Sequence, residues 1–184
     1  MRLLDRIFRL EEINCGDRCP TYLYRWTLFQ PRRPKRLWNG FGIYLHKFVG
    51  DDWSLDLHDH PKRFVSIGLR GAYVEETPNR IFHEFEPGRY LPESCAVCGW
   101  WAGGTVMHER TVDRVYRAPW IRTFPAEHVH RLRLLGDRKP CWTLVVVLCH
   151  VREWGFHHEG TFIPWREYVK GGSSWIADKM RSCL

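Results

Sequence analysis

Short stretches rich in aromatic and β-branched residues follow one another along most of this chain, separated by glycine, proline, asparagine and aspartate. Such stretches predict β-strands, and the residues between them predict turns. The most apolar stretch, 142–151, is dominated by β-branched residues and predicts a central, buried strand. The predicted strands are 22–29, 37–49, 54–60, 63–69, 72–76, 80–85, 106–118, 121–124, 127–135, 142–151, 153–158 and 161–168.

Many short strands with little helix between them predict an all-β sandwich or barrel. The turn signal Thr77-Pro78-Asn79 predicts that 72–76 and 80–85 form a hairpin, and the glycines and prolines of 87–105 predict a long loop. Short helices are predicted at both ends. Residues 1–12 place apolar side chains at helical spacing, and Ser173 or Ser174 would cap a helix at 175–181.

The bulk composition fits one folded domain. The chain has 184 residues, 44% of them hydrophobic, and a mean hydropathy of -0.42. It shows neither an internal repeat nor a linker, so we expect a single domain over 1–184 with its barrel at about 20–169. No apolar run approaches the roughly 20 residues that span a bilayer. The start, residues 1–6, lacks the apolar core of a signal peptide, so we expect a cytoplasmic protein without a membrane partner.

The net charge of +7 favours anionic partners such as phosphorylated metabolites, carboxylates or nucleic acid. Much of the excess lies in residues 31–36, where prolines interrupt the basic run. A solvated basic loop explains this segment better than a nucleic-acid-binding arm, so nucleic acid is not the favoured partner.

Seven cysteines, an odd number without an export signal, predict free thiols. Cys95 and Cys98 form a C-x-x-C pair, and Cys15 and Cys19 form another close pair. Together they offer an alternative, a four-thiolate zinc site, although the two spacings differ.

Two histidine pairs are the strongest chemical signal. His58 and His60 alternate in one predicted strand, and His128 and His130 alternate in another about seventy residues later. Alternate residues of a strand share a face, so each pair can point the same way. Neutral imidazole is the commonest protein ligand for transition metals. The pattern predicts a histidine-lined metal site inside a β-structure.

The same residues resemble the motifs of the cupin superfamily. His58-Asp59-His60 followed by Gly71 is similar to the first cupin motif, and Pro125 five residues before His130 is similar to the second. The resemblance implies an RmlC-like jelly roll, that is, a double-stranded β-helix barrel. It also implies that His58, His60 and His130 are the metal ligands.

The sequence departs from the family pattern at two positions. The usual ligand glutamate falls at Phe64, with Val65 beside it, and Glu127 replaces the glycine of the second motif. A three-histidine set resembles the thiol-dioxygenase branch of the cupins, which implies Fe(II), with Mn, Ni or Zn as alternatives. Additional ligands, or groups that fix the ring tautomers, are His128, Asp56 and Glu127.

The favoured function is therefore a mononuclear non-haem iron oxygenase or dioxygenase acting on a small polar or anionic substrate. Arg63, Tyr73 and Arg131 are candidates for binding that substrate, and no residue is singled out as catalytic. One alternative is a non-redox isomerase or epimerase for a phosphorylated or nucleotide-linked sugar, with a histidine as general base. The other is a non-catalytic binding module, including a cupin that has lost its metal. Cupins often pair, which makes a homodimer an expectation as well.

Overall fold

The structure is a computed structural model that describes residues 7–14, 20–31, 40–54, 56–85, 104–136, 138–158 and 161–170. The chain divides into two compact units. The larger comprises Met1–Thr77 and Asp113–Leu184, and the smaller comprises Pro78–Val112. The expectation of a single domain stays a prediction.

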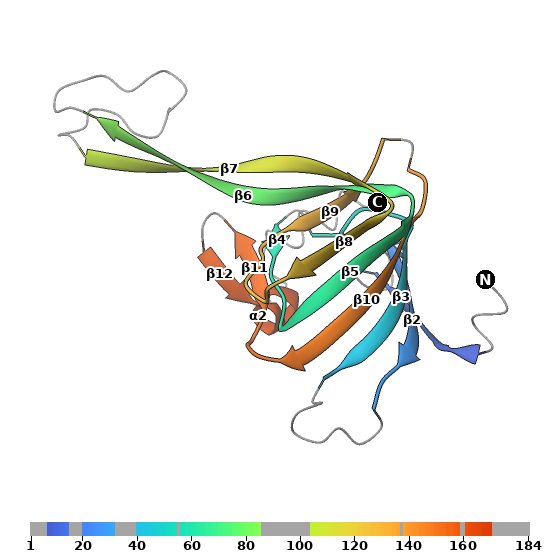
Figure 1. The fold of residues 1–184 in the computed structure, drawn as a ribbon. Helices are drawn as coiled ribbons and strands as arrows, with labels where there is room; N and C mark the ends of the chain where they lie inside the picture. Colours follow the sequence, from blue (N-terminus) through green and yellow to red (C-terminus); the bar gives the residue numbers. More distant parts are fainter. Residues whose placement is uncertain are drawn as a thin grey trace. The chain divides into compact units, whose positions relative to one another are not determined.

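The first layer of the larger unit is a six-stranded sheet with the order β1-β2-β3-β10-β5-β8. All neighbours in it are antiparallel. Figure 1 shows β2, β3, β10, β5 and β8 side by side. β10, the most apolar stretch of the chain, lies in the middle of the sheet as its composition predicts. In sheet order the strands are Arg9–Ile13, Leu23–Phe29, Gly42–Phe48, Cys141–His150, Lys62–Arg70 and Trp120–Phe124.

The register of this sheet decides which side chains share a face. Arg25 pairs with His46, His46 with Thr143, and Thr143 with Gly68, so these residues form one row across four strands. A second row, four residues further along β10, contains Val147, Phe64 and Phe124. Since strand side chains alternate, both rows lie on the same face, and their side chains line a cavity.

The second layer consists of two short sheets of three strands each. One has the order β12-β11-β4, with bounds Thr161–Pro164, Gly155–His158 and Leu57–His58. The other has the order β7-β6-β9, with bounds Gly104–Arg117, Ala72–Phe85 and Arg131–Leu134, and only its residues outside Pro78–Val112 belong to the larger unit. A single bridge between His58 and His130 joins β4 to the residue that precedes β9. This seam therefore connects the two short sheets within the larger unit.

A buried cluster packs where the two layers meet. Its members are Leu23, Phe48, Tyr73, Leu134 and Cys141, and Leu132 and Trp120 pack against it. Since the cluster draws on β2, β3 and β10 as well as on β6 and β9, it holds the layers together. The all-β prediction is confirmed, and closure of the sheets into a barrel remains a prediction.

The smaller unit contains the second part of β6 and the first part of β7, which are neighbours in their sheet. The predicted turn at Thr77-Pro78-Asn79 is wrong, because β6 continues through it as one strand of 14 residues. The pairing of β6 with β9 ends at Glu76. Pro78 lies beyond that point, where its missing N–H does not interrupt the ladder with β9.

Three further predictions concern the ends of the chain. The helix predicted over 1–12 is wrong for Arg9–Ile13, which forms β1 and pairs with β2, and residues 1–6 lie outside the described residues. The strand predicted over 161–168 ends at Pro164, and helix α2 (Trp165–Lys170) follows. The C-terminal helix at 175–181 and most of the loop at 87–105 lie outside the described residues. Among the residues described, no helix has the length and apolar character needed to cross a membrane.

Candidate metal centre

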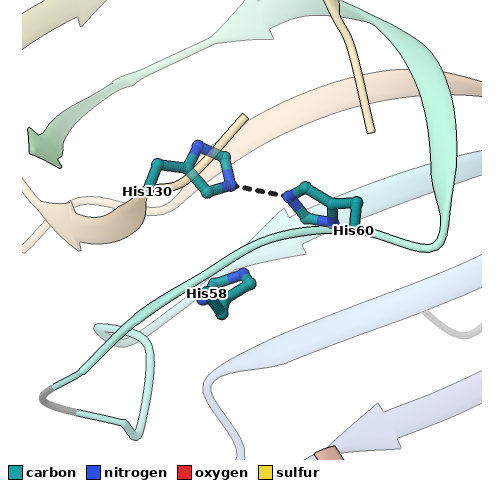
Figure 2. Close-up of side chains that lie close together, drawn as sticks. All are labelled: His58, His60 and His130. Atoms are coloured by element: carbon teal, nitrogen blue, oxygen red, sulfur yellow. Dashed lines mark hydrogen bonds between the residues drawn. The ribbon is translucent and has the colours of Figure 1, made fainter. Parts of the chain in front are cut away.

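Three histidine rings meet between the two layers. Ring nitrogens of His58, His60 and His130 all lie within 4.8 Å of one another. Figure 2 shows the rings of His60 and His130 facing each other, with their Nε2 atoms 2.9 Å apart. The ring of His58 lies 5.2 Å from each of the other two, measured between ring centroids. The structure thus brings together the three residues to which the cupin resemblance pointed.

Backbone hydrogen bonds place two of these rings. The N–H of His58 donates to the carbonyl of His130, and the N–H of His130 donates to the carbonyl of His58, both at 2.9 Å. This exchange defines a directly opposed pair in an antiparallel ladder. Because opposed residues project their side chains to the same face, His58 and His130 are held beside each other.

The third ring is placed by alternation, although its segment is not a strand. β4 ends at His58, and the N–H of His60 donates to the carbonyl of Ala126 at 3.0 Å. Asp59, between the two histidines, is fully buried, and its carboxylate accepts from the N–H of Gly155 at 2.9 Å and contacts Arg152 at 2.7 Å. Asp59 is thereby engaged with β11 and with Arg152, while its two neighbours share the site.

Behind His130 lies a buried carboxylate that the sequence analysis missed. Glu75 on β6 is 1% exposed, and its Oε1 atom lies 2.8 Å from Nδ1 of His130 and 3.0 Å from Nε2 of His128. Its Oε2 atom accepts from Arg122 at 2.6 Å. Burial alone would raise the pKa of Glu75, but the hydrogen bonds from the two histidines and Arg122 hold it far below its ordinary value. Glu75 is therefore an anion with three charge-assisted contacts.

This contact fixes the tautomer of His130. An ionised carboxylate only accepts hydrogen bonds, so Nδ1 of His130 carries the proton and Nε2 presents its lone pair to the site. Burial lowers the pKa of His130 to about 4 and that of His60 well below its ordinary value. Burial also lowers the pKa of His58. All three imidazoles are neutral at pH 7, which is the form that binds metals.

His58 has a carboxylate neighbour as well. Nδ1 of His58 lies 4.0 Å from Oδ2 of Asp52, which in turn accepts a hydrogen bond from the N–H of Leu132 at 2.8 Å. Asp52 is thus held against β9 and places a negative group on the Nδ1 side of His58. Glu75 thus orients the ring of His130 in the way that carboxylates orient metal-binding histidines, whereas Asp52 lies beyond hydrogen-bond distance from His58.

The spacing of the rings suits a metal ion. Two nitrogen ligands at right angles on an ion with bonds of about 2.1 Å lie about 3.0 Å apart. The two Nε2 atoms of His60 and His130 are 2.9 Å apart, close to that value. Three protein ligands of this kind leave coordination positions for other molecules.

The centre borders a cavity of about 180 Å³, which we call the histidine cavity. Side chains of both layers line it, among them Phe48, Tyr73, Leu132 and Val145. Phe64, which stands where many cupins have a ligand glutamate, also lines it. Its ring lies 4.8 Å from that of His60 and stacks on Phe124 at 4.6 Å. A phenyl ring donates no ligand, so this wall of the cavity is apolar.

The other predicted ligands lie elsewhere or act differently. His128 contacts Glu75 and forms with Glu75 and His130 a second group that could hold a metal. The guanidinium of Arg122 already occupies that carboxylate, which disfavours a cation there. Asp56 accepts from Tyr168 at 2.7 Å and lies 3.0 Å from Nδ1 of His158, so it belongs to a separate cluster. Glu127 is exposed.

The three predicted substrate-binding residues also differ from one another. Arg63 is exposed on β5, and Arg131 donates through Nε to Glu76 at 3.0 Å, so neither lines the histidine cavity. Tyr73 does line it, but its hydroxyl accepts from Arg122 at 3.0 Å. The cation that lines the cavity is Arg25, which the sequence analysis did not select. The alternation of residues 22–29 predicts that Arg25 lies on one face of a strand, but it does not show which face is internal.

The alternative zinc site and most of the basic loop fall outside the described residues. These are the positions of Cys15, Cys19, Cys95 and Cys98 and of residues 32–36.

Comparison with known proteins gives similar solved structures and nothing at the level of sequence. No family model matches the chain, and no curated protein matches it. The DMSP lyase DddQ from Ruegeria pomeroyi is similar with a TM-score of 0.43 and 14% identity, over 78% of this chain and 57% of that one. An RmlC-like cupin protein from Ralstonia eutropha has a TM-score of 0.44 and 11% identity, over 92% and 83% of the two chains. A recombinant oxalate oxidase in complex with glycolate has a TM-score of 0.47 and 13% identity, over 95% and 79%.

Proteins described as cupins are thus among the similar structures. This chain spans little more than half the length of the lyase. Every one of these TM-scores is below 0.5, so these likenesses do not indicate a function.

Proposed function

We propose that this protein is a metal-dependent enzyme of the cupin type, with His58, His60 and His130 as ligands of one divalent transition metal. The observation that carries the proposal is the convergence of three neutral imidazoles from two segments 70 residues apart, with an ionised carboxylate behind His130. A ligand set of this kind suits a functional metal site.

The favoured chemistry is that of a mononuclear non-haem iron oxygenase. A three-histidine set resembles that of the thiol dioxygenases, which implies Fe(II), and Mn, Ni or Zn are the alternatives. When bound, the ion would supply Lewis acidity and open positions for oxygen and substrate. The chain itself contributes the apolar wall of Phe64, Phe124, Val145 and Val147, which excludes water from that side of the site.

The space at the histidines is small. The histidine cavity has a volume of about 180 Å³, below the range of about 300–1,000 Å³ that is usual for drug-sized ligands. This volume favours a small polar or anionic group as the part of the substrate that reaches the histidines.

Metal analysis tests the ligand assignment directly. Untagged protein would be loaded with Fe(II) without oxygen, desalted and measured by elemental analysis, beside His58→Ala, His130→Ala and the control His150→Ala. His150 is an exposed histidine at the end of β10. We expect about one metal per chain in the parent and the control, and loss of most metal in the other two. Equal metal content in all four folded proteins would overturn the assignment.

A further inference from the structure

A second hollow, of about 320 Å³, adjoins the histidine cavity. The two share Arg25, His58, His60 and Phe64 among their lining residues, and the second adds Lys62 and Trp154. We call it the Lys62 hollow. Among the described residues that line it there are two basic side chains, Arg25 and Lys62, and no aspartate or glutamate. The hollow is therefore positively charged without an internal counter-charge.

Arg25 enters the hollow with most of its donors unused. Its Nε atom donates to Nε2 of His46 at 3.2 Å. Its Nη1 atom lies 3.8 Å from Glu11, which is longer than a hydrogen bond. A guanidinium has five N–H donors, so both of its terminal nitrogens remain available among the described residues. These terminal nitrogens suit a planar oxyanion that accepts two hydrogen bonds.

Lys62 lines the same hollow. Its Nζ atom donates to the carbonyl of Gly40 at 2.9 Å, which uses one of its three donors. Gly40 has φ of +81°, and a Cβ atom there would lie 2.8 Å from Cε of Lys62. The turn at Gly40 thus positions the ammonium group and requires glycine to do so.

A third observation points to a polar ligand near these cations. The hydroxyl of Thr143 lines the histidine cavity and is buried, yet it has no hydrogen-bond partner among the described residues. Thr143 pairs with His46, which pairs with Arg25, so these side chains stand in one row on the inner face. A buried hydroxyl without a partner is unfavourable unless a ligand or water supplies one.

We propose that Arg25 and Lys62 form an anion subsite that binds the oxyanionic group of a small substrate, a carboxylate or a phosphate, whose other end reaches the three histidines. The inference rests on the proposed function only in placing the reacting end at the histidines. The oxyanion would take the free donors of both cations and bring a negative charge into a hollow whose described lining contains no acid.

Binding of simple anions by the metal-free protein tests the subsite without knowledge of the substrate. Sodium acetate and inorganic phosphate would be titrated separately at constant ionic strength, with chloride as the background salt. Nitrogen–proton NMR would follow the Nε–H signal of Arg25, assigned by its loss in Arg25→Gln. We expect this signal to shift and saturate with at least one of the two anions, and the tighter anion identifies the chemical class.

Two variants make the test specific. Lys62→Gln removes one cation and keeps the Arg25 signal, and it should weaken anion binding about tenfold. Arg63→Gln is the matched control, because Arg63 follows Lys62 on β5 but is exposed and lines neither hollow. It removes the same charge and should change binding less than twofold. Equal binding by Lys62→Gln and Arg63→Gln, or no saturable shift with either anion, would overturn the proposal.

Metal content, measured on the same variants, separates this inference from the proposed function. Loss of anion binding with unchanged metal content supports a distinct subsite. Specific anion binding in a protein that takes up no metal leaves the subsite standing and removes the proposed enzyme. A full metal site without specific anion binding leaves the proposed enzyme standing and overturns the subsite.

Discussion

Charged groups on two sides of the histidine site differ in whether they have partners of opposite charge close by. Behind His130, Glu75 is surrounded by His128, His130 and Arg122, and every charge has a partner within 3.0 Å. In the Lys62 hollow, Arg25 and Lys62 face no acid among the described lining residues. The charges around Glu75 therefore stabilise the fold, since removing one partner leaves a buried charge alone. The unpaired side is where an added anion gains the most.

The largest expected effect lies on the paired side. Glu75→Leu leaves Arg122 and two histidines without their shared anion, so the free energy of unfolding should fall by about 3–5 kcal/mol. Arg25→Gln should change it by less than about 1 kcal/mol, because Arg25 has no close ion pair. Urea unfolding of both variants measures the difference. Similar losses in the two would show that the sides do not differ.

Stability should also depend on pH through His130. Its pKa in the folded chain is about 4, below the ordinary 6.5, so the unfolded chain binds more protons between these values. Its contribution is therefore complete above about pH 6.5 and is lost as the pH falls toward 4, by about 2–3 kcal/mol. Unfolding of metal-free protein across this range measures it. Burial lowers the pKa of His46, His58 and His60 as well, so His130→Gln should reduce the dependence without abolishing it, and an unchanged slope in that variant would contradict the assignment.

A milder change at Glu75 separates orientation from stability. Glu75→Gln keeps the shape and one acceptor oxygen but no longer fixes the proton on Nδ1 of His130, so metal affinity should fall about 10–100-fold. Competition with a chromogenic chelator measures it. Glu127→Gln, at an exposed glutamate, is the control and should leave affinity unchanged. Parent-like affinity in Glu75→Gln would remove the orienting role.

A charge placed on the shared wall should act on both sides at once. Phe64 lines both hollows and contacts His60, so Phe64→Glu brings a carboxylate toward the metal site and toward the cations. We expect tighter metal binding and about tenfold weaker binding of acetate or phosphate. Phe64→Leu is the uncharged control. Unaltered anion binding in the glutamate variant would mean that the anion does not bind near this wall.

The smallest effect is expected at the turn that holds Lys62. Gly40→Ala introduces a Cβ atom 2.8 Å from Cε of Lys62 at a positive φ, so the ammonium should shift and anion affinity should fall a few-fold. Gly136→Ala is the control, since a Cβ there meets nothing within 4 Å. The acetate and phosphate titrations measure both. Equal anion affinities in Gly40→Ala and Gly136→Ala would show that Gly40 does not position Lys62.

The sequence anticipated those parts of this arrangement that depend on local pattern. The β-branched run of β10 indicated the middle of a sheet, and the alternation of His58 and His60 indicated a shared face even though only His58 lies in a strand. The helix predicted over 1–12 failed because pairing of Leu10 with Trp26 outweighs a weak helical pattern.

What the sequence could not supply is register between distant strands. Glu75 and Glu76 are neighbours of one type, yet Glu75 reaches His130, whereas Glu76 pairs with Arg131. Only the alignment of β6 with β9 decides between them, and no local signal carries it. Arg25 and Lys62 are far apart in the sequence, and it is again the pairing of distant strands that brings both to one hollow. Arg63, which the sequence favoured, is the next residue after Lys62 on β5 and therefore points to the opposite face.

The two-bond bridge between His58 and His130 has a kinetic consequence. It is the single ladder contact between β4 and the segment before β9, so this seam is expected to open more readily than the continuous ladders around it. An ion bound across it would have to lose a ligand before the seam opens, so its binding free energy would stabilise the closed seam. Amide hydrogen exchange at His58 and His130 should therefore slow sharply when metal binds, while exchange in the middle of β10 stays the same.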